Sequence, residues 1–145
     1  MIGLLQRVTQ ASVTIDGDVV ASINTGILLL VGVEKNDSEK NALRLFEKTI
    51  AYRVFADDED KMNLSLKDVH GGLLLVPQFT LAANTQKGLR PSFSDAASPE
   101  LAKQLFNFLV SHAREKYTVV ETGVFGADMQ VSLINDGPVT FWLQT

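Results

Sequence analysis

The sequence contains no cysteine and only two histidines in 145 residues. Without cysteine there can be no disulfide, no thiolate-ligated zinc or iron–sulfur cluster, and no thiolate nucleophile. The histidines, His70 and His112, do not stand at a metal-ligand spacing, and the chain has no P-loop or dinucleotide-binding glycine pattern. We therefore expect neither a metal nor a cofactor.

Long apolar runs are also missing. The longest, Ile27–Val31 and Leu73–Pro77, are far too short to cross a bilayer and are typical of buried strands. The N-terminal stretch has no basic region ahead of an apolar segment, as a signal peptide would. No linker, repeat or low-complexity segment divides the chain. These features predict a single soluble domain over residues 1–145, in the cytoplasm and without a membrane partner.

The chain has no basic cluster. Its Lys and Arg residues number 13 against 17 Asp and Glu, the net charge is −4, and the basic residues are scattered. Proteins that hold nucleic acid by neutralising many phosphates carry basic stripes instead. We therefore expect no DNA partner. If RNA is the substrate, contact should be confined to a short piece of it.

The apolar pattern predicts several short strands. Leu4–Val8 and Ala11–Ile15 lead through a hairpin turn, Asp16-Gly17-Asp18, into Val19–Ile23, and a second turn leads into Ile27–Val33. Further strands are predicted at Leu73–Val76, Thr118–Glu121, Met129–Ile134 and Val139–Leu143, the last two joined by a turn at Asn135-Asp136-Gly137-Pro138.

Two segments have the spacing of amphipathic helices. Asp37 or Ser38 can cap the first, and Ser98-Pro99-Glu100 is a strong start for the second. The apolar face of the first helix comprises Ala42, Leu45, Phe46, Thr49, Ile50 and Val54, and that of the second Leu101, Leu105, Phe108, Leu109 and His112. The acidic run Asp57–Asp60 is predicted to be a solvated turn, because a calcium loop needs alternating carboxylates and a glycine. Together the segments predict an α+β or layered α/β/β domain with largely antiparallel strands.

The usual catalytic constellations are not found. His70 lies in a glycine-rich turn, and His112 lies late on the second helix, where we expect a half-buried structural role. Neither has an obvious serine or threonine to activate, so a Ser-His-Asp triad is not indicated.

Two segments nevertheless differ from ordinary packing. At Gln78-Phe79-Thr80 a buried strand ends in residues that can present backbone N–H groups and a hydroxyl, as stabilisation of an oxyanion requires. The alternative is a plain strand end that leads into a turn. The segment Asn135–Thr140 contains Gly137-Pro138 and is either a functional loop or a simple turn between strands.

Six stretches that follow one another along the chain carry a family pattern: LLQRVTQASV, GVEKND, KMNLSL, VPQFTLAANT, RPSFSDAASPE and FGADMQVSLINDGPVTFWLQ. Through these stretches the chain resembles bacterial D-aminoacyl-tRNA deacylases over essentially its whole length. Two positions depart from the pattern of that family. Pro77 stands where members commonly have a serine before Gln-Phe-Thr, and Asp60 stands where a glycine usually precedes Lys-Met-Asn.

The resemblance implies a layered α/β/β fold, with mostly antiparallel strands in two sheets and two main helices, that forms a homodimer with its active site at the subunit interface. It implies hydrolysis of the ester of D-aminoacyl-tRNA, and of glycyl-tRNA to some degree, with rejection of the L-form. In this family the terminal adenosine of the tRNA enters the site, and its 2′-hydroxyl is thought to take part in the reaction.

The resemblance also implies roles for individual residues. Those matched to the pocket are Gln78, Phe79 and Thr80, whose main-chain N–H groups would polarise the ester carbonyl. Gly137 and Pro138 match the family's cis Gly-Pro pair. In the family this pair enters the partner's pocket and shuts out an L side chain. Phe125 and Met129 match the segment near the terminal adenosine, and Arg7 matches a residue that helps to hold the Gly-Pro loop.

Thr80 is the obvious candidate nucleophile, but without a base it would be a weak one, so we expect it to shape the pocket. Pro77 has no backbone N–H, so the oxyanion donors should come from Gln78 onwards.

Three other functions compete with this one. A non-catalytic dimeric module for RNA 3′ ends would show binding without turnover. A general esterase would cleave simple esters and would need its own nucleophile. A structural interaction protein would explain both unusual loops as plain turns, but not the long ordered match.

Overall fold

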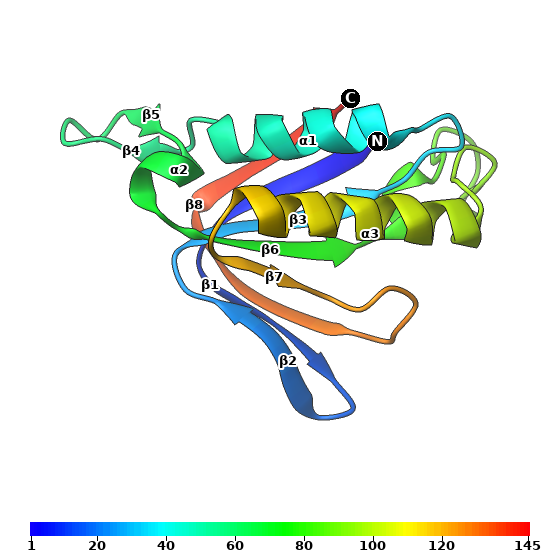
Figure 1. The fold of residues 1–145 in the computed structure, drawn as a ribbon. Helices are drawn as coiled ribbons and strands as arrows, with labels where there is room; N and C mark the ends of the chain where they lie inside the picture. The colour runs from blue at the N-terminus through cyan, green and yellow to red at the C-terminus, as the bar shows by residue number, and fades with distance from the viewer.

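The computed structural model, which covers residues 1–145, is organised around one long strand, β1 (Ile2–Ile15). The first half of β1 pairs with β3 (Gly26–Gly32), and the second half pairs with β2 (Asp18–Ile23). Along its other edge lies β8 (Gln130–Gln144), antiparallel over nearly the whole length. Figure 1 shows β2 and the second half of β1 curving away from β3, so one hydrogen-bonded sheet forms two strand layers.

The remaining elements complete three layers. Strand β6 (Gly72–Pro77) pairs in parallel with β3, and β7 (Val120–Thr122) pairs in parallel with β6. The two main helices lie on one face of β3 and β6 (Figure 1); they are α1 (Glu39–Ala51) and α3 (Pro99–Lys116). The short elements are β4 (Phe55–Ala56), β5 (Met62–Leu64), α2 (Leu66–Val69) and the 3₁₀ turn η1 (Phe79–Ala82). The expected layered α/β/β fold with two main helices is confirmed.

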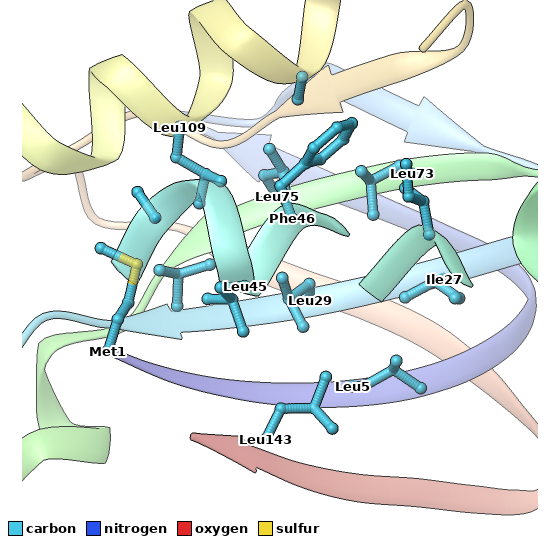
Figure 2. Close-up of a cluster of buried hydrophobic side chains, with 14 of the residues drawn as sticks. Met1, Leu5, Ile27, Leu29, Leu45, Phe46, Leu73, Leu75, Leu109 and Leu143 are labelled. Carbon is cyan, nitrogen blue, oxygen red and sulfur yellow. The ribbon is translucent and has the colours of Figure 1, made fainter. Parts of the chain in front are cut away.

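Alternation along β3 explains why its run of apolar residues is buried on both faces. Ile27 and Leu29 belong to a core cluster between this strand layer and the helices, whereas Leu28 belongs to a second cluster between the two strand layers. Figure 2 shows the first cluster, in which Leu5, Leu45, Phe46, Leu73, Leu75 and Leu109 surround Ile27 and Leu29. Each such side chain contributes about 1.5–3 kcal/mol on burial.

The helices begin where the sequence predicts. Ser38 is the N-cap residue of α1, and the Ser98 hydroxyl accepts a hydrogen bond from the Leu101 N–H at 3.3 Å at the start of α3. One detail is wrong: α1 ends at Ala51, so Val54 is buried in the core from the loop that follows and is not part of the helical face. His112 is half-buried against the rings of Phe46 and Phe108, as expected.

The predicted turn between two C-terminal strands is also wrong. The chain continues as the single strand β8, because its two halves both pair with β1 in the same direction. Thr140 lies opposite Gln6 and Asn135 lies opposite Val8. Only Arg7 lies between these partners on β1, whereas residues 136–139 lie between them on β8, so this segment bulges out of the strand.

The acidic run Asp57–Asp60 forms the exposed turn between β4 and β5, as predicted. The Asp57 carboxylate accepts hydrogen bonds from the Asn63 side chain and from the Lys61 and Glu59 N–H groups, which lower its pKa. No helix in the structure combines the length and the apolar composition that crossing a membrane requires.

Candidate functional site

A pocket of about 670 Å³ opens at the carboxyl ends of β3 and β6. Because these neighbouring strands are parallel, the segments that follow them diverge from the same edge of the sheet. The first turns of α3 and the β7–β8 connection close the sides, and Figure 1 shows both at the same end of the molecule. The lining residues from these elements include Val31, Gln78, Phe79, Phe106, Phe125 and Met129.

The pocket wall is mostly apolar. Of its 18 lining residues 13 are hydrophobic, and the only polar side chains are those of Gln78 and Asp128. Phe79 and Phe93 lie at the mouth with ring centroids 5.2 Å apart, and both are exposed. Such a wall suits a flat, largely apolar group such as a nucleobase, fixed by a few polar contacts.

The strand end at Gln78 offers backbone donors to this pocket, though not from Gln78 itself. The Gln78 N–H donates to the Val31 carbonyl at 2.7 Å and is therefore engaged in the sheet. Phe79 and Thr80 follow as the first two residues of η1, in which the first internal bond runs from Leu81 N–H to the Gln78 carbonyl. The N–H groups of Phe79 and Thr80 thus have no partner within the turn.

No side chain at the pocket is equipped as an activated nucleophile. The Thr80 hydroxyl accepts a hydrogen bond from the Gln78 side-chain amide at 2.6 Å, and neither His70 nor His112 lines the pocket. No group of three or more His, Asp or Glu side chains is close enough to hold a metal ion. The pocket thus offers main-chain donors at its edge and a single carboxylate, that of Asp128.

Pro77 is accommodated without loss of a sheet hydrogen bond. It lies opposite Val31 of β3, but the bond to the Val31 carbonyl comes from the next residue, Gln78. On the other edge of β6, pairing with β7 ends at Leu75. A backbone N–H at position 77 would therefore have no strand carbonyl as its acceptor on that edge.

The Gly137-Pro138 loop is held by two side chains. Arg7, which lies opposite the bulge, donates from Nε to the Asp136 carbonyl at 2.9 Å and from Nη1 to the Val54 carbonyl at 2.6 Å. The Asn135 side chain closes the bulge, accepting from the Val139 N–H at 2.6 Å. The Gly137–Pro138 peptide bond is cis, and Gly137 has φ +140, a conformation that other residues rarely adopt.

The structure divides the site residues expected from the sequence into two groups. Gln78, Phe79, Phe125 and Met129 line the pocket, with Thr80 beside it. The second group, formed by Arg7, Gly137 and Pro138, is not part of the pocket wall. Arg7 ties it to Val54, directly before β4, and Figure 1 shows β4 at the opposite end of the molecule from the β7–β8 connection. Within one chain the two groups do not meet.

The family model described as D-Tyr-tRNA(Tyr) deacylase matches residues 4–144. The chain belongs to the D-Tyr-tRNA(Tyr) deacylase family. It is 59% identical over 143 residues to a D-aminoacyl-tRNA deacylase of Pseudoalteromonas atlantica and 60% identical over 144 residues to one of Legionella pneumophila. Each alignment covers 99% of this chain and 99% of the relative. The chain is therefore an enzyme of a hydrolase family.

Solved structures agree with this deacylase fold. One described as "c-Myc DNA Unwinding Element Binding Protein" superposes with a TM-score of 0.95 at 37% identity, covering 100% of this chain and 99% of that one. Another, described as a probable eukaryotic D-amino acid tRNA deacylase, has a TM-score of 0.86 at 15% identity and covers 99% and 98%. At that identity the second supports the fold alone.

The sequence did not single out several residues of the site. Phe93, Pro99 and Ala102 line the pocket, and the matching stretch RPSFSDAASPE contains the first two without any motif that marks them as lining residues. Asp128, the only ionisable side chain in the wall, lies between Phe125 and Met129 in the deacylase match. The sequence places Asn135 in a turn without a role for its side chain, which in the structure holds the bulge.

Proposed function

We propose that the chain hydrolyses the ester between a D-amino acid and the terminal adenosine of tRNA, as a proofreading enzyme of translation in the cytoplasm. Glycyl-tRNA would be cleaved to some degree and L-aminoacyl-tRNA would be rejected. One observation carries the proposal: the pocket of this deacylase-family chain has at its edge two main-chain N–H groups that the η1 turn leaves without an internal partner, and no activated nucleophile.

The N–H groups of Phe79 and Thr80 would stabilise the oxyanion that forms on the ester carbonyl. Fixed backbone donors need no reorganisation as charge develops, and the loss of one such donor typically costs roughly 10²–10³ in kcat. The attacking group would be water, which the 2′-hydroxyl of the terminal adenosine would help to activate. The bond between the acyl carbon and the 3′-oxygen would break, and that oxygen would leave with a proton as the 3′-hydroxyl of the tRNA. This division of labour fits a site in which the Thr80 hydroxyl is already hydrogen-bonded to Gln78.

The terminal adenosine would occupy the apolar wall. Phe125 and Met129 come from the β7–β8 connection, and Phe79 comes from the strand end that carries the donors. A base seated between these side chains would place its ribose, and with it the ester, near the N–H groups of Phe79 and Thr80.

Gly137 and Pro138 would exclude an L side chain from a second copy of the chain. They lie away from the pocket of their own chain, with Arg7 fixing the loop through Asp136 and Val54. In a two-fold homodimer each loop would enter the partner's pocket, and the two sites would be equivalent. A D side chain would then point away from the loop, and glycine would have no side chain to exclude.

A similar structure is described as a DNA-binding protein, but the charge and the pocket of this chain argue against a DNA partner. The net charge of −4 and the mostly apolar pocket favour one nucleotide over a charged duplex.

The test is to incubate the protein with D-tyrosyl-tRNA and to follow loss of the ester, with p-nitrophenyl acetate as a simple ester in parallel. We expect multiple turnovers on the tRNA and negligible cleavage of the simple ester. Binding of the tRNA without turnover would favour the non-catalytic module, and efficient cleavage of the simple ester would favour a general esterase.

A further inference from the structure

The pocket is flanked by a stretch of the chain that carries no acidic residue. From Val69 to Ser94 there is no Asp or Glu, although the whole chain has 17 of them and a net charge of −4. Within this stretch are two permanent positive charges, Lys87 and Arg90. The local charge is therefore opposite to that of the molecule.

Lys87 and Arg90 lie at the tip of a loop whose base is part of the pocket mouth. Asn84 and Ser92 exchange two backbone hydrogen bonds, of 2.7 and 3.0 Å, which close the loop at its base. Phe93, the next residue, lines the pocket and packs against Phe79. Arg90 is three residues from Phe93, a chain span of at most about 11 Å.

Both side chains are free to bind a ligand. Lys87 and Arg90 are exposed, and neither forms an ion pair. Lys35, in contrast, is paired with Asp95 at 3.3 Å. The exposed cations at the mouth therefore face solvent without a competing carboxylate in their own loop.

We propose that Lys87 and Arg90 bind backbone phosphates of the single-stranded 3′ end of tRNA where it leaves the pocket. The inference rests on the proposed function, because that function places the terminal nucleotide in the pocket and the preceding phosphates at the mouth. Lys and Arg neutralise phosphates and release counterions, which makes binding dependent on salt. Few contacts are needed, in keeping with the acidic balance of the chain.

The experiment compares KM and kcat for D-tyrosyl-tRNA between 50 and 200 mM KCl in four proteins. These are the wild type, K87Q/R90Q, the charge-preserving K87R/R90K, and K61Q/K116Q. The last is a matched control, because it removes the same charge from exposed lysines that pair with Glu59 and Glu115 away from the pocket. 3′-O-D-tyrosyl-adenosine, which has no phosphate, serves as a second substrate.

We expect K87Q/R90Q to raise KM for the tRNA at low salt with little change in kcat. Its log–log salt slope should be smaller than that of the wild type by about 1.4, or about 0.7 for each single-strand phosphate. Its deficit should thus shrink about sevenfold between 50 and 200 mM salt. K87R/R90K and K61Q/K116Q should keep the wild-type slope, and all four proteins should cleave the adenosine ester equally.

A wild-type slope in K87Q/R90Q would overturn the inference and leave the proposed function intact. An equal loss on the adenosine ester would also overturn it, because the loop would then shape the site instead of binding phosphate. Failure of the wild type to cleave D-tyrosyl-tRNA at all would instead refute the proposed function.

Discussion

Thr80 carries the hydroxyl nearest to the proposed oxyanion donors, and its surroundings argue against a nucleophilic role. The hydroxyl accepts a hydrogen bond from Gln78, and the pocket wall contains no histidine to act as its base. We expect Thr80→Ala to keep single-turnover hydrolysis of D-tyrosyl-tRNA within about tenfold of wild type, a barrier change near 1.4 kcal/mol. Hydrolysis of a D-tyrosyl-tRNA that ends in 2′-deoxyadenosine should be slowed far more than tenfold.

Pro77→Ser is the companion variant, since it restores the hydroxyl common in the family. It should change the rate little, because Pro77 removes no sheet hydrogen bond. A loss of roughly a thousandfold in Thr80→Ala, about 4 kcal/mol, with the deoxy substrate cleaved normally, would identify the threonine as the nucleophile.

A side chain at Gly137 would be unfavourable for two reasons, steric overlap and backbone strain. A Cβ would lie 2.6 Å from Val139 Cγ2 and 2.9 Å from the Val139 nitrogen, and φ is +140. Gly137→Ala should therefore lower the free energy of unfolding by about 1–3 kcal/mol and also reduce deacylation. Gly17→Ala is the control, because Gly17 has φ +91 with no atom near its Cβ position. It should lose stability in urea denaturation but keep its activity per folded molecule. Equal deacylation per folded molecule in the two variants would show that Gly137 has no role in the site.

The sequence predicts which residues are available at the site better than it predicts which of their groups are already hydrogen-bonded. The half-buried place of His112 follows from helical spacing, and the absence of a triad follows from counting histidines. The engagement of the Gln78 N–H with Val31 could not be predicted, because it depends on the parallel register of β3 and β6. That register is a tertiary property, and it moves the candidate donors to Phe79 and Thr80.

At the scale of elements, α3 connects the core to the pocket. Its first turns line the pocket, and at its C-cap the Tyr117 hydroxyl lies 3.0 Å from the Leu66 carbonyl and 2.7 Å from that of Gly71. Burial raises the pKa of Tyr117 above its usual value of 10.0. The tyrosine thus joins the end of α3 to the turn that starts β6.

Tyr117→Phe should lower the free energy of unfolding by about 1 kcal/mol near pH 7, because a carbonyl partner is left without its donor. The raised pKa of Tyr117 also predicts how stability changes with pH. As pH rises, the tyrosine ionises first in the unfolded chain, so the free energy of unfolding falls as pH rises above 10. Urea denaturation at pH 9 and pH 11 should show a steeper loss in wild type than in the variant. Identical losses would mean that Tyr117 does not contribute to the alkaline fall.

Strand β8 shows where local patterns mislead. Asn, Asp, Gly and Pro in succession are typical of a turn, and the sequence predicts a turn between two strands there. The chain instead bulges at residues 136–139 and resumes pairing with β1, because the long apolar alternation of β1 offers partners to both halves of β8. The helices and β3 were predictable because caps and apolar runs are local signals.

The fold keeps the two groups of site residues apart, so the proposed site requires a second copy of the chain. If each Gly-Pro loop completes the partner's site, two inactive variants should complement each other. Ala127 lines the pocket, so a tryptophan there would fill it. We expect a refolded mixture of Gly137→Ala, with an intact pocket, and Ala127→Trp, with an intact loop, to regain activity in mixed dimers. With random pairing about one quarter of the sites would be functional. No gain on mixing, together with a fully active monomer at assay concentration, would contradict the dimer.

The layered fold and the pocket end of β6 were predictable from the sequence together with the family resemblance. The pocket itself was not, because α3, the β7–β8 connection and the segment around Phe93 meet only in the folded molecule. The separation of Arg7 and Gly137 from that pocket is likewise a consequence of how β1 and β8 pair.

The proposed stereospecificity is that this pocket cleaves D-aminoacyl esters and excludes the L-form. Single-turnover hydrolysis of matched D- and L-tyrosyl-tRNA by the wild-type protein tests it most directly, with glycyl-tRNA as a substrate that has no side chain. We expect rapid loss of the D-ester, measurable loss of the glycyl ester, and an L-ester that decays no faster than without enzyme. Comparable rates on the D- and L-esters would contradict it.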